Sequence, residues 1–296
     1  LRLSPCDRLP DVPYCVAAMR HGNTESWCPK NSGGKYSGRN ITLKYALANS
    51  VNTVTAQLID KVGPRAVSSL VQRLGVRNEV PSVPSIALGT PDIKVHDLVA
   101  AYSAFANQGV YVEPTFITRI EDRAGTVLYR AVPETHDVFN KEIAYAMISL
   151  LKGVTEAGSG VRLRHNWMQD NPVYQEVVTG YPYEFKNPIA GKTGTTQNQS
   201  DGWFMGMVPN LVTGVWVGAE DRSVHFDNIT YGQGATMALP IWANYMRKNY
   251  QDSLGISLED FEKPDQFSFN LDCSESDEAL EEIDLEVEAD LEEFDF

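Results

Sequence analysis

Apolar residues recur three or four positions apart, the spacing of an amphipathic helix, in several separate stretches of the sequence. In the first stretch Leu43 and Leu47 share one apolar face behind Thr42, a residue type that favours a helix N-cap. Pro64 favours a first helical position and Gly109 favours a helix stop. The pattern predicts helices over residues 42–48, 53–61, 64–74, 95–108, 140–154 and 237–250.

Short apolar runs between turn residues predict strands in the second half of the chain. Residues 115–121 and 127–130 flank a turn at Asp122–Gly125 and form one hairpin, while the polar stretch 162–186 reads as a surface loop or insertion. Three further strands are expected at 189–196, 202–208 and 213–218. Helices, a hairpin, more helix and then meandering strands indicate an α+β fold.

Charge is distributed unevenly along the 296 residues. The formal net charge is -14, but residues 265–296 hold 14 acidic residues and no Lys or Arg, which leaves 25 acidic and 25 basic residues in the rest of the chain. We expect a globular part at 1–258 and an acidic, disordered tail at 259–296, with a partner-binding segment as the alternative for the tail. The neutral body lacks the basic face that nucleic-acid binding requires.

The cysteines and the apolar runs indicate the compartment of the protein and which kinds of site and segment it contains. Cys6, Cys15 and Cys28 crowd near the start of the chain; their spacing allows one disulfide among them in an oxidising compartment, or free thiols. No Cys or His spacing fits a zinc site, so neither a metal nor a cofactor is expected. The sequence has no run of 18 apolar residues, no start Met and no signal pattern, so we expect an excised piece of a longer protein.

A cation and hydroxyl groups gather in one predicted strand, within the stretch 188–206. Lys192 and Gly194 alternate with Thr193 and Thr195, so each pair occupies its own face of an extended chain. Gly194 leaves room for a close neighbour, either another backbone or a ligand. Such a strand at a cleft would bind a carboxylate; the alternative is an ordinary hairpin with a polar edge.

A second polar motif, Ser50-Val51-Asn52, falls in the break between the first two predicted helices. A hydroxyl and an amide at a helix junction can point into a cleft. Alternatively, Ser50 and Asn52 cap the helix that is expected to begin near Thr53. The same Ser-x-Asn pattern recurs at Ser268–Asn270 in the predicted tail, where we assign it no role.

Together, Ser50-Val51-Asn52 and Lys192-Thr193-Gly194-Thr195 are two of the three motifs of the serine penicillin-recognising enzymes. Over roughly residues 1–250 the sequence resembles the transpeptidase domain of class A penicillin-binding proteins. The further segments that carry the resemblance are Gly34–Gly38, Thr42–Leu43, Ala46–Asn49, Ile86–Gly89, Ala100–Tyr102, Phe105–Asn107, Asp201–Phe204, Gly214–Gly218 and Ala238–Trp242. The resemblance implies a β-lactamase/transpeptidase-like α+β fold, an antiparallel sheet with helices on both faces.

The third motif of this family, Ser-x-x-Lys, carries the nucleophile and precedes Ser-x-Asn by several tens of residues. The chain matches it at Ser32–Lys35, a Gly-rich turn too close to Ser50, and at Ser149–Lys152, which lies out of order. We therefore expect the nucleophile upstream of Leu1 and this piece to be inactive alone.

The resemblance implies a peptidoglycan D,D-transpeptidase that works through an acyl-serine intermediate on stem peptides ending in D-Ala-D-Ala and is a target of β-lactams. In this resemblance Ser50 would relay a proton, Asn52 would orient the catalytic lysine, and Lys192 would supply the positive field of the cleft. Thr193 to Thr195 would bind the substrate carboxylate and the oxyanion. It also implies an upstream glycosyltransferase domain and membrane anchor, and a periplasmic location. The alternatives are a D,D-carboxypeptidase or β-lactamase-like enzyme, or a non-catalytic binding module of the same fold.

Overall fold

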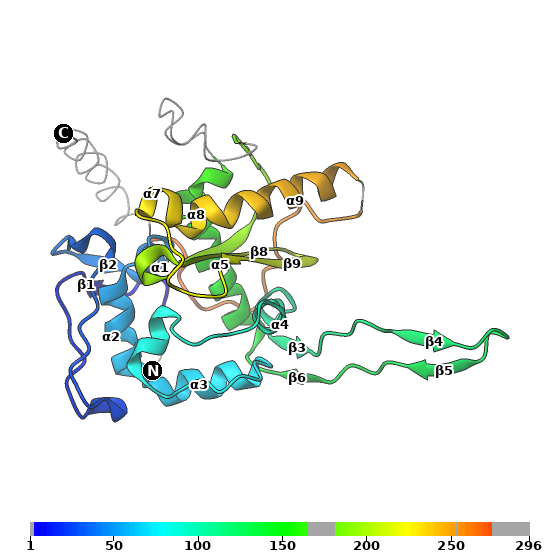
Figure 1. Cartoon of the computed structure of the whole chain (residues 1–296), viewed down its shortest axis with the longest axis horizontal. Helices are drawn as coiled ribbons and strands as arrows, with labels where there is room; N and C mark the ends of the chain where they lie inside the picture. Colours follow the sequence, from blue (N-terminus) through cyan, green and yellow to red (C-terminus); the bar gives the residue numbers. More distant parts are fainter. Residues whose placement is uncertain (1–2, 165–180, 253, 274–296) are drawn as a thin grey trace.

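A three-stranded antiparallel sheet forms the centre of the computed structural model, which describes residues 3–164, 181–252 and 254–273. Its strands are β7 (Ala190–Thr195), β8 (Asp201–Val208) and β9 (Leu211–Gly218), in the order β7–β8–β9 (Figure 1). All three strands predicted from the sequence are confirmed, with ends that differ by one or two residues. Because β8 lies in the middle, β7 keeps one open edge.

Helices cover both faces of this sheet, which confirms the expected fold class. On one face Ala190 and Met207 pack against Ile148 and Leu151 of α5 (Lys141–Ala157), and α4 (Val95–Ala106) lies beside α5. On the other face Phe204 contacts Trp242 of α9 (Leu239–Gln251). In Figure 1, α9 runs above the sheet and α4 below it; the short helices α7 (Ile229–Gly232) and α8 (Gly234–Met237) precede α9.

The first half of the described chain forms a helical part next to the sheet. It contains α1 (Leu43–Ala48), α2 (Asn52–Val62) and α3 (Pro64–Arg73). The predicted N-cap at Thr42 is present, since its hydroxyl accepts the N–H of Tyr45, and the Asn140 side chain caps α5 by accepting the N–H of Ile143. The 3₁₀ turns are η1 (Arg20–Gly22), η2 (Ser32–Gly34), η3 (Pro84–Leu88), η4 (Val161–Leu163) and η5 (Gln197–Gln199).

Four short strands were not predicted from the sequence. β1 (Arg8–Pro10) pairs with β2 (Asn40–Thr42), before and at the start of the first predicted helix. β3 (Val110–Val112) pairs with β6 (Thr135–Asp137). Each is three residues long, too short for a pattern of alternating polarity to identify it.

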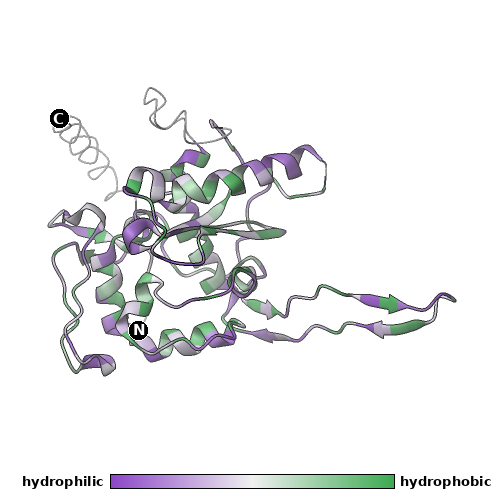
Figure 2. Ribbon diagram, in the orientation of Figure 1, coloured by the Kyte–Doolittle hydropathy of each residue, from purple (hydrophilic) through white to green (hydrophobic). Residues whose placement is uncertain are grey.

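The predicted hairpin extends beyond the β3–β6 pair as a long arm, residues 113–134 (Figure 1). Its strands are β4 (Arg119–Glu121) and β5 (Val127–Arg130), and every residue in both is exposed. Figure 2 shows hydrophobic residues along it, of which Phe116 and Val132 are each 87% exposed. Because these residues are exposed, the arm takes no part in the core, and a two-stranded ribbon of this kind has only marginal stability in water.

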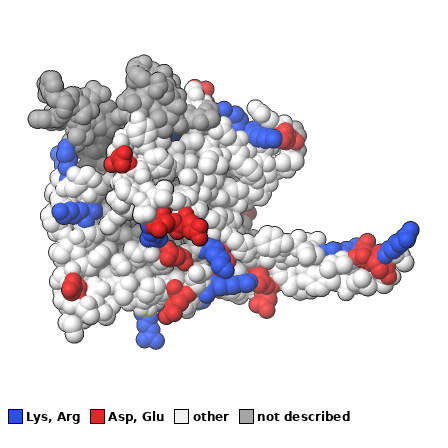
Figure 3. All heavy atoms as spheres, viewed as in Figure 1, with Lys and Arg blue, Asp and Glu red and all other residues white. Residues whose placement is uncertain are grey.

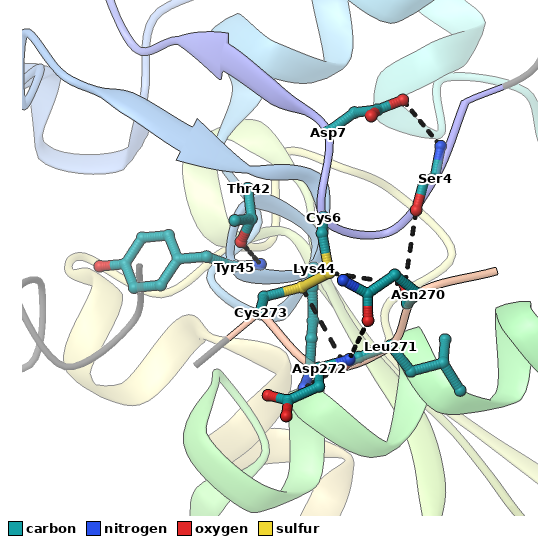
Figure 4. The surroundings of a disulfide bond; sticks show 10 residues. All are labelled: Ser4, Cys6, Asp7, Thr42, Lys44, Tyr45, Asn270, Leu271, Asp272 and Cys273. Atoms are coloured by element: carbon teal, nitrogen blue, oxygen red, sulfur yellow. Dashed lines mark hydrogen bonds between the residues drawn. A yellow bond between two sulfur atoms is a disulfide. The ribbon is translucent and has the colours of Figure 1, made fainter. Parts of the chain in front are cut away.

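The residues that follow α9 lie along the domain as a strap, residues 254–273. Phe261 is buried against Ile148 and Leu151 of α5, and Asp260 pairs with Lys152 at 2.7 Å. The strap ends at Cys273, which forms a disulfide with Cys6 across a sequence separation of 267 residues (Figure 4). Residues 259–273, assigned to the acidic tail from the sequence, are therefore held against the domain; the rest of that tail lies outside the described residues.

Cys15 and Cys28 form a second disulfide, so one bridge joins two of the three N-terminal cysteines and no cysteine is free. The sequence left free thiols open and did not predict the Cys6–Cys273 bridge. Most of the predicted loop at 162–186 lies outside the described residues. Among the residues that are described, no helix has the length and apolar character to cross a membrane.

Candidate active site

A cleft opens between the edge of β7 and the helical part of the domain. It brings together segments that lie far apart in the sequence, from Trp27 to Ala235. The residues that line it include Trp27–Gly33, Ser50, Asn52, Ile86–Gly89, Ser159, Lys192–Gln199, Trp203 and Trp216. All six site residues predicted from the sequence lie on its wall.

Two motifs 142 residues apart in the sequence meet in this cleft. The ammonium of Lys192 donates hydrogen bonds to the hydroxyl of Ser50 and, over 2.9 Å, to the carbonyl oxygen of Thr193. The strand and the helix junction thus share one polar site, as the combined motifs predicted.

Ser50 reaches the cleft because α1 ends sharply. Its φ of 55° lies in the left-handed region, which is uncommon for a residue with a side chain. The N–H of Val51 donates to the carbonyl of Ala46 over 2.8 Å and so closes the turn. The predicted break at Asn49–Ser50 is confirmed.

Lys192 carries a positive charge in a largely desolvated position. Burial lowers the pKa of its ammonium from 10.5 to about 8. Within the described part of the chain, no carboxylate pairs with it. A bound anion would compensate the burial, so this cation favours negatively charged ligands.

Asn52 begins α2 and is fixed from the opposite wall of the cleft. Its side-chain amide donates to the carbonyl oxygen of Lys30 over 2.7 Å. The N-cap position of α2 is Val51, and neither Ser50 nor Asn52 supplies a capping bond there. The alternative that these two residues serve as helix caps is therefore wrong.

A hydrogen-bond network that the sequence did not reveal binds polar groups in the first turn of α2. Asn31 accepts the N–H of Thr53 at 3.2 Å, and Asp11 accepts both the Thr53 hydroxyl and the Asn31 amide at 2.7 Å. Burial of Asp11 opposes ionisation, but the hydrogen bond from the Ser37 backbone and these side-chain bonds hold its pKa below the ordinary value. The network fixes the segment that holds Asn52.

The open edge of β7 presents backbone groups to the cleft. The N–H of Thr196 donates to the carbonyl of Asp201 on β8 over 3.2 Å, so Thr196 faces its partner strand. Hydrogen-bonded residues alternate along an antiparallel pair, which turns the N–H and C=O of Thr193 and Thr195 towards the open edge. The bond from Lys192 to the Thr193 carbonyl agrees with this direction.

The side chains of this strand follow the predicted alternation. On β8, Met205 lies opposite Lys192 and Trp203 lies opposite Gly194, so these four residues share one face of the sheet. Thr193 and Thr195 lie on the other face. A Cβ on Gly194 would come within 3.0 Å of the Trp203 Cβ, so the close neighbour of Gly194 is this side chain, where the sequence suggested another backbone or a ligand. The Thr195 hydroxyl accepts the N–H of Gly234 at 3.0 Å.

Neither internal Ser-x-x-Lys match is placed as a nucleophile and its lysine would be. Ser32 lines the cleft, but Gly33 and Gly34 have φ values of 74° and 72°, so Lys35 is not one helical turn away. Ser149–Lys152 lies on α5 away from the cleft lining, with Lys152 paired to Asp260. Among the described residues no group of three His, Cys, Asp or Glu side chains could hold a metal ion.

Comparison with known proteins agrees with this site. The profile of the family described as "Penicillin binding protein transpeptidase domain" matches residues 15–220, more than half of the chain. The chain belongs to this transpeptidase family. Penicillin-binding protein 1A of Aquifex aeolicus (strain VF5) is 37% identical to the transpeptidase domain over 243 residues, 81% of this chain and 29% of that protein.

Other relatives give the same result. Penicillin-binding protein 1A of Neisseria meningitidis (strain Z2491) is 33% identical over 231 residues, 76% of this chain and 26% of that protein. The crystal structure of penicillin-binding protein 1A from Haemophilus influenzae superposes with a TM-score of 0.69 at 26% identity, over 86% of this chain and 40% of that one. This transpeptidase domain thus spans under a third of the curated relatives that it matches.

Ser159 is a polar residue of the transpeptidase cleft that was not identified from the sequence. It follows Gly158 at the end of α5, and its hydroxyl lies 2.6 Å from that of Thr193. The only signal was a serine between two glycines directly after a helix, which reads equally well as an ordinary helix stop.

Proposed function

We propose that this domain is one part of a peptidoglycan D,D-transpeptidase, with its nucleophilic serine on a preceding segment. The observation that carries the proposal is the bond between Lys192 and Ser50 at the rim of a cleft beside an open strand edge. The family membership of residues 15–220 supports it.

The first step is acylation of the serine by the donor stem peptide. The serine gives its proton to the lysine of its own motif as its oxygen attacks the penultimate D-Ala carbonyl. The C–N bond to the terminal D-Ala then breaks, and the leaving amine takes a proton through Ser50. Asn52, held by Lys30, would orient the lysine of the nucleophile motif. In the second step the amine of another stem peptide attacks the ester, loses a proton and releases the serine.

Recognition of the donor rests on β7. Lys192 supplies a cation and Thr193 and Thr195 supply hydroxyls for the terminal carboxylate. The outward N–H of Thr195 is suited to bind the oxyanion, a contact typically worth about 3 kcal/mol. The open edge can also pair with an extended substrate backbone.

Two further properties belong to this proposal. A structural relative, PonA1 from Mycobacterium tuberculosis, has been solved in complex with penicillin V, and its domain superposes with a TM-score of 0.64. We expect β-lactams to acylate this enzyme likewise, the ring C–N bond replacing the peptide bond. Two disulfides fit an oxidising compartment, here the periplasmic side of a membrane to which the native protein is anchored.

The product formed from a D-Ala-D-Ala peptide tests the proposal. A longer form of the protein that includes the segment before Leu1 is incubated with donor peptide and an amine acceptor, and products are identified by mass spectrometry. We expect the cross-linked peptide and free D-Ala. Hydrolysis alone would indicate a carboxypeptidase, and the absence of any acyl-enzyme would indicate a binding module. On the face shown in Figure 3, acidic and basic side chains are mixed, and that face lacks the continuous basic surface that nucleic-acid binding uses.

A further inference from the structure

The end of α5 lies between the two walls of the cleft. The N–H of Ser159 donates to the carbonyl of Ala48, two residues before Ser50, over 3.0 Å. The hydroxyl of Ser159 lies 2.6 Å from the hydroxyl of Thr193 on β7. One residue therefore contacts both the α1 wall and the β7 wall.

The approach to α1 leaves no space for a side chain. A Cβ on Gly158 would lie 2.7 Å from the carbonyl carbon of Ala48 and 2.9 Å from its Cβ. Real Cβ atoms essentially never come so close, so glycine is required for the contact that places Ser159.

The approach to β7 is fixed one turn earlier in the same helix. Thr155 is fully buried, and its hydroxyl donates to the carbonyl of Ile189 over 2.6 Å. Together with Ser159 it joins the C-terminal end of α5 to the residue before β7 and to the middle of that strand. The Ser159–Thr193 distance is therefore set by buried structure and does not depend on a mobile surface contact.

The two hydroxyls form a directional pair. Each has one O–H to donate, and a carboxylate can only accept. When Ser159 donates to Thr193, the O–H of Thr193 is left to point elsewhere, and a hydroxyl that already accepts a bond donates more strongly. Thr193 lies on the cleft wall next to the Lys192 ammonium, where an anion would sit.

We propose that Ser159 is a positioning residue that orients the Thr193 hydroxyl towards the carboxylate of the bound acyl donor. This rests on the proposed transpeptidase function and assigns a role in it to a residue outside the three motifs. It makes carboxylate recognition depend on α5 as well as on the Lys-Thr-Gly strand.

Acylation rates with a charged and an uncharged ligand test this role. In the longer form of the protein, the second-order rate of acylation is measured with benzylpenicillin and with its methyl ester. Ser159→Ala is expected to lower the rate of acylation by benzylpenicillin about tenfold, the effect of losing one hydrogen bond to a charged group. The rate of acylation by the methyl ester should change little. Ser159→Thr, which keeps the hydroxyl, should restore the rate. Ser149→Ala, in the preceding helix α5 but away from the cleft, is the matched control.

The outcomes separate the two proposals. An equal loss for both ligands would show that Ser159 only supports the structure and would overturn the inference, as would an unchanged rate with benzylpenicillin. If the unaltered longer protein forms no acyl-enzyme, the proposed function fails and this inference fails with it. Acylation of the unaltered protein with no effect of Ser159→Ala leaves the function standing and removes only the inference.

Discussion

The ammonium of Lys192 donates a hydrogen bond to the hydroxyl of Ser50, joining a strand edge to a helix junction. A lysine bound to a neutral hydroxyl keeps its charge uncompensated, unlike a lysine in an ion pair. Ser50 in turn is held in a left-handed conformation by the end of α1. The pair therefore combines a buried cation with a hydroxyl in a fixed place, the requirements for an anionic substrate and a proton relay.

Replacement of Lys192 by Ala is expected to abolish acylation by labelled penicillin in the longer form of the protein. The cation that draws the carboxylate into the cleft and bonds Ser50 would be lost, and we expect a decrease of at least about a hundredfold, as for the loss of one electrostatic stabiliser. Lys152→Ala is the control, because Lys152 belongs to the out-of-order Ser-x-x-Lys match and pairs with Asp260. Unchanged labelling of Lys192→Ala would remove Lys192 from the site.

Acylation by carboxylate ligands is expected to fall above pH 8. Burial lowers the pKa of Lys192 to about 8, so its charge is present below that pH and is lost above it. A pH–rate profile with benzylpenicillin and its methyl ester checks this, since the ester does not need the cation. Parallel profiles for the two ligands would contradict it.

The same pKa predicts how stability responds to pH. The unfolded chain keeps the Lys192 proton up to about its ordinary pKa of 10.5, whereas the folded chain releases it near 8. The unfolded state therefore binds more protons in this window, and the free energy of unfolding rises with pH between them. Urea unfolding of the chain and of Lys192→Met at pH 7 and pH 10 measures the difference; a stability gap that does not narrow at pH 10 would contradict the prediction.

Residues 1–296 alone are expected to form no covalent adduct with labelled penicillin, because neither internal Ser-x-x-Lys match has the required geometry. Gel detection of the label on this chain, beside the longer form as positive control, gives the answer. Stable labelling of the chain at Ser32 or Ser149 would show that the nucleophile lies within it.

Removal of the Cys6–Cys273 bridge is expected to lower the free energy of unfolding by about 5 kcal/mol, because it closes a very long loop. The double variant Cys6→Ser with Cys273→Ser is compared with Cys15→Ser with Cys28→Ser, whose loop has a separation of 13 residues and whose loss should cost about 3 kcal/mol. Urea unfolding measures both. Equal stability of the first variant and the unaltered chain would mean that the strap contributes little.

Gly158→Ala and Gly153→Ala should have opposite effects, although both lie in or next to α5. Gly158 has no room for a Cβ against Ala48, and we expect a loss of about 1–3 kcal/mol. At Gly153 the nearest contact is 3.9 Å, so alanine should stabilise the helix by about 0.5–1 kcal/mol. Thermal unfolding distinguishes them, and a stable Gly158→Ala variant would contradict the tight contact with Ala48.

The elements that the sequence predicted are those with a local physical cause. Thr42 and Asn140 cap their helices through bonds within three residues, and β8 and β9 are largely apolar runs between turns. β1, with three residues that include Pro10, carries no such signal and forms only because β2 lies beside it. Its formation depends on contacts that a local pattern does not contain.

The site shows the same division. The six motif residues could be named from the sequence because the family resemblance supplied the pairing of Ser50 with Lys192. The contacts of Asn52 with Lys30 and of Ser159 with Thr193 could not be predicted from the sequence. Each joins residues of common types that come together only through tertiary packing. The partner of Cys6 likewise depends on where the strap ends.

The Cys6–Cys273 bridge also determines how the domain would respond to mechanical force. Tension applied between residue 6 and residue 273 passes directly through the sulfur–sulfur bond, and the 267-residue loop that contains the cleft carries none of it. The rate at which a pulled domain unfolds depends on the force that acts on its folded residues. While the disulfide is intact, the residues between the two cysteines bear none of that force. The cleft geometry should therefore persist under a pull that would unfold the reduced protein.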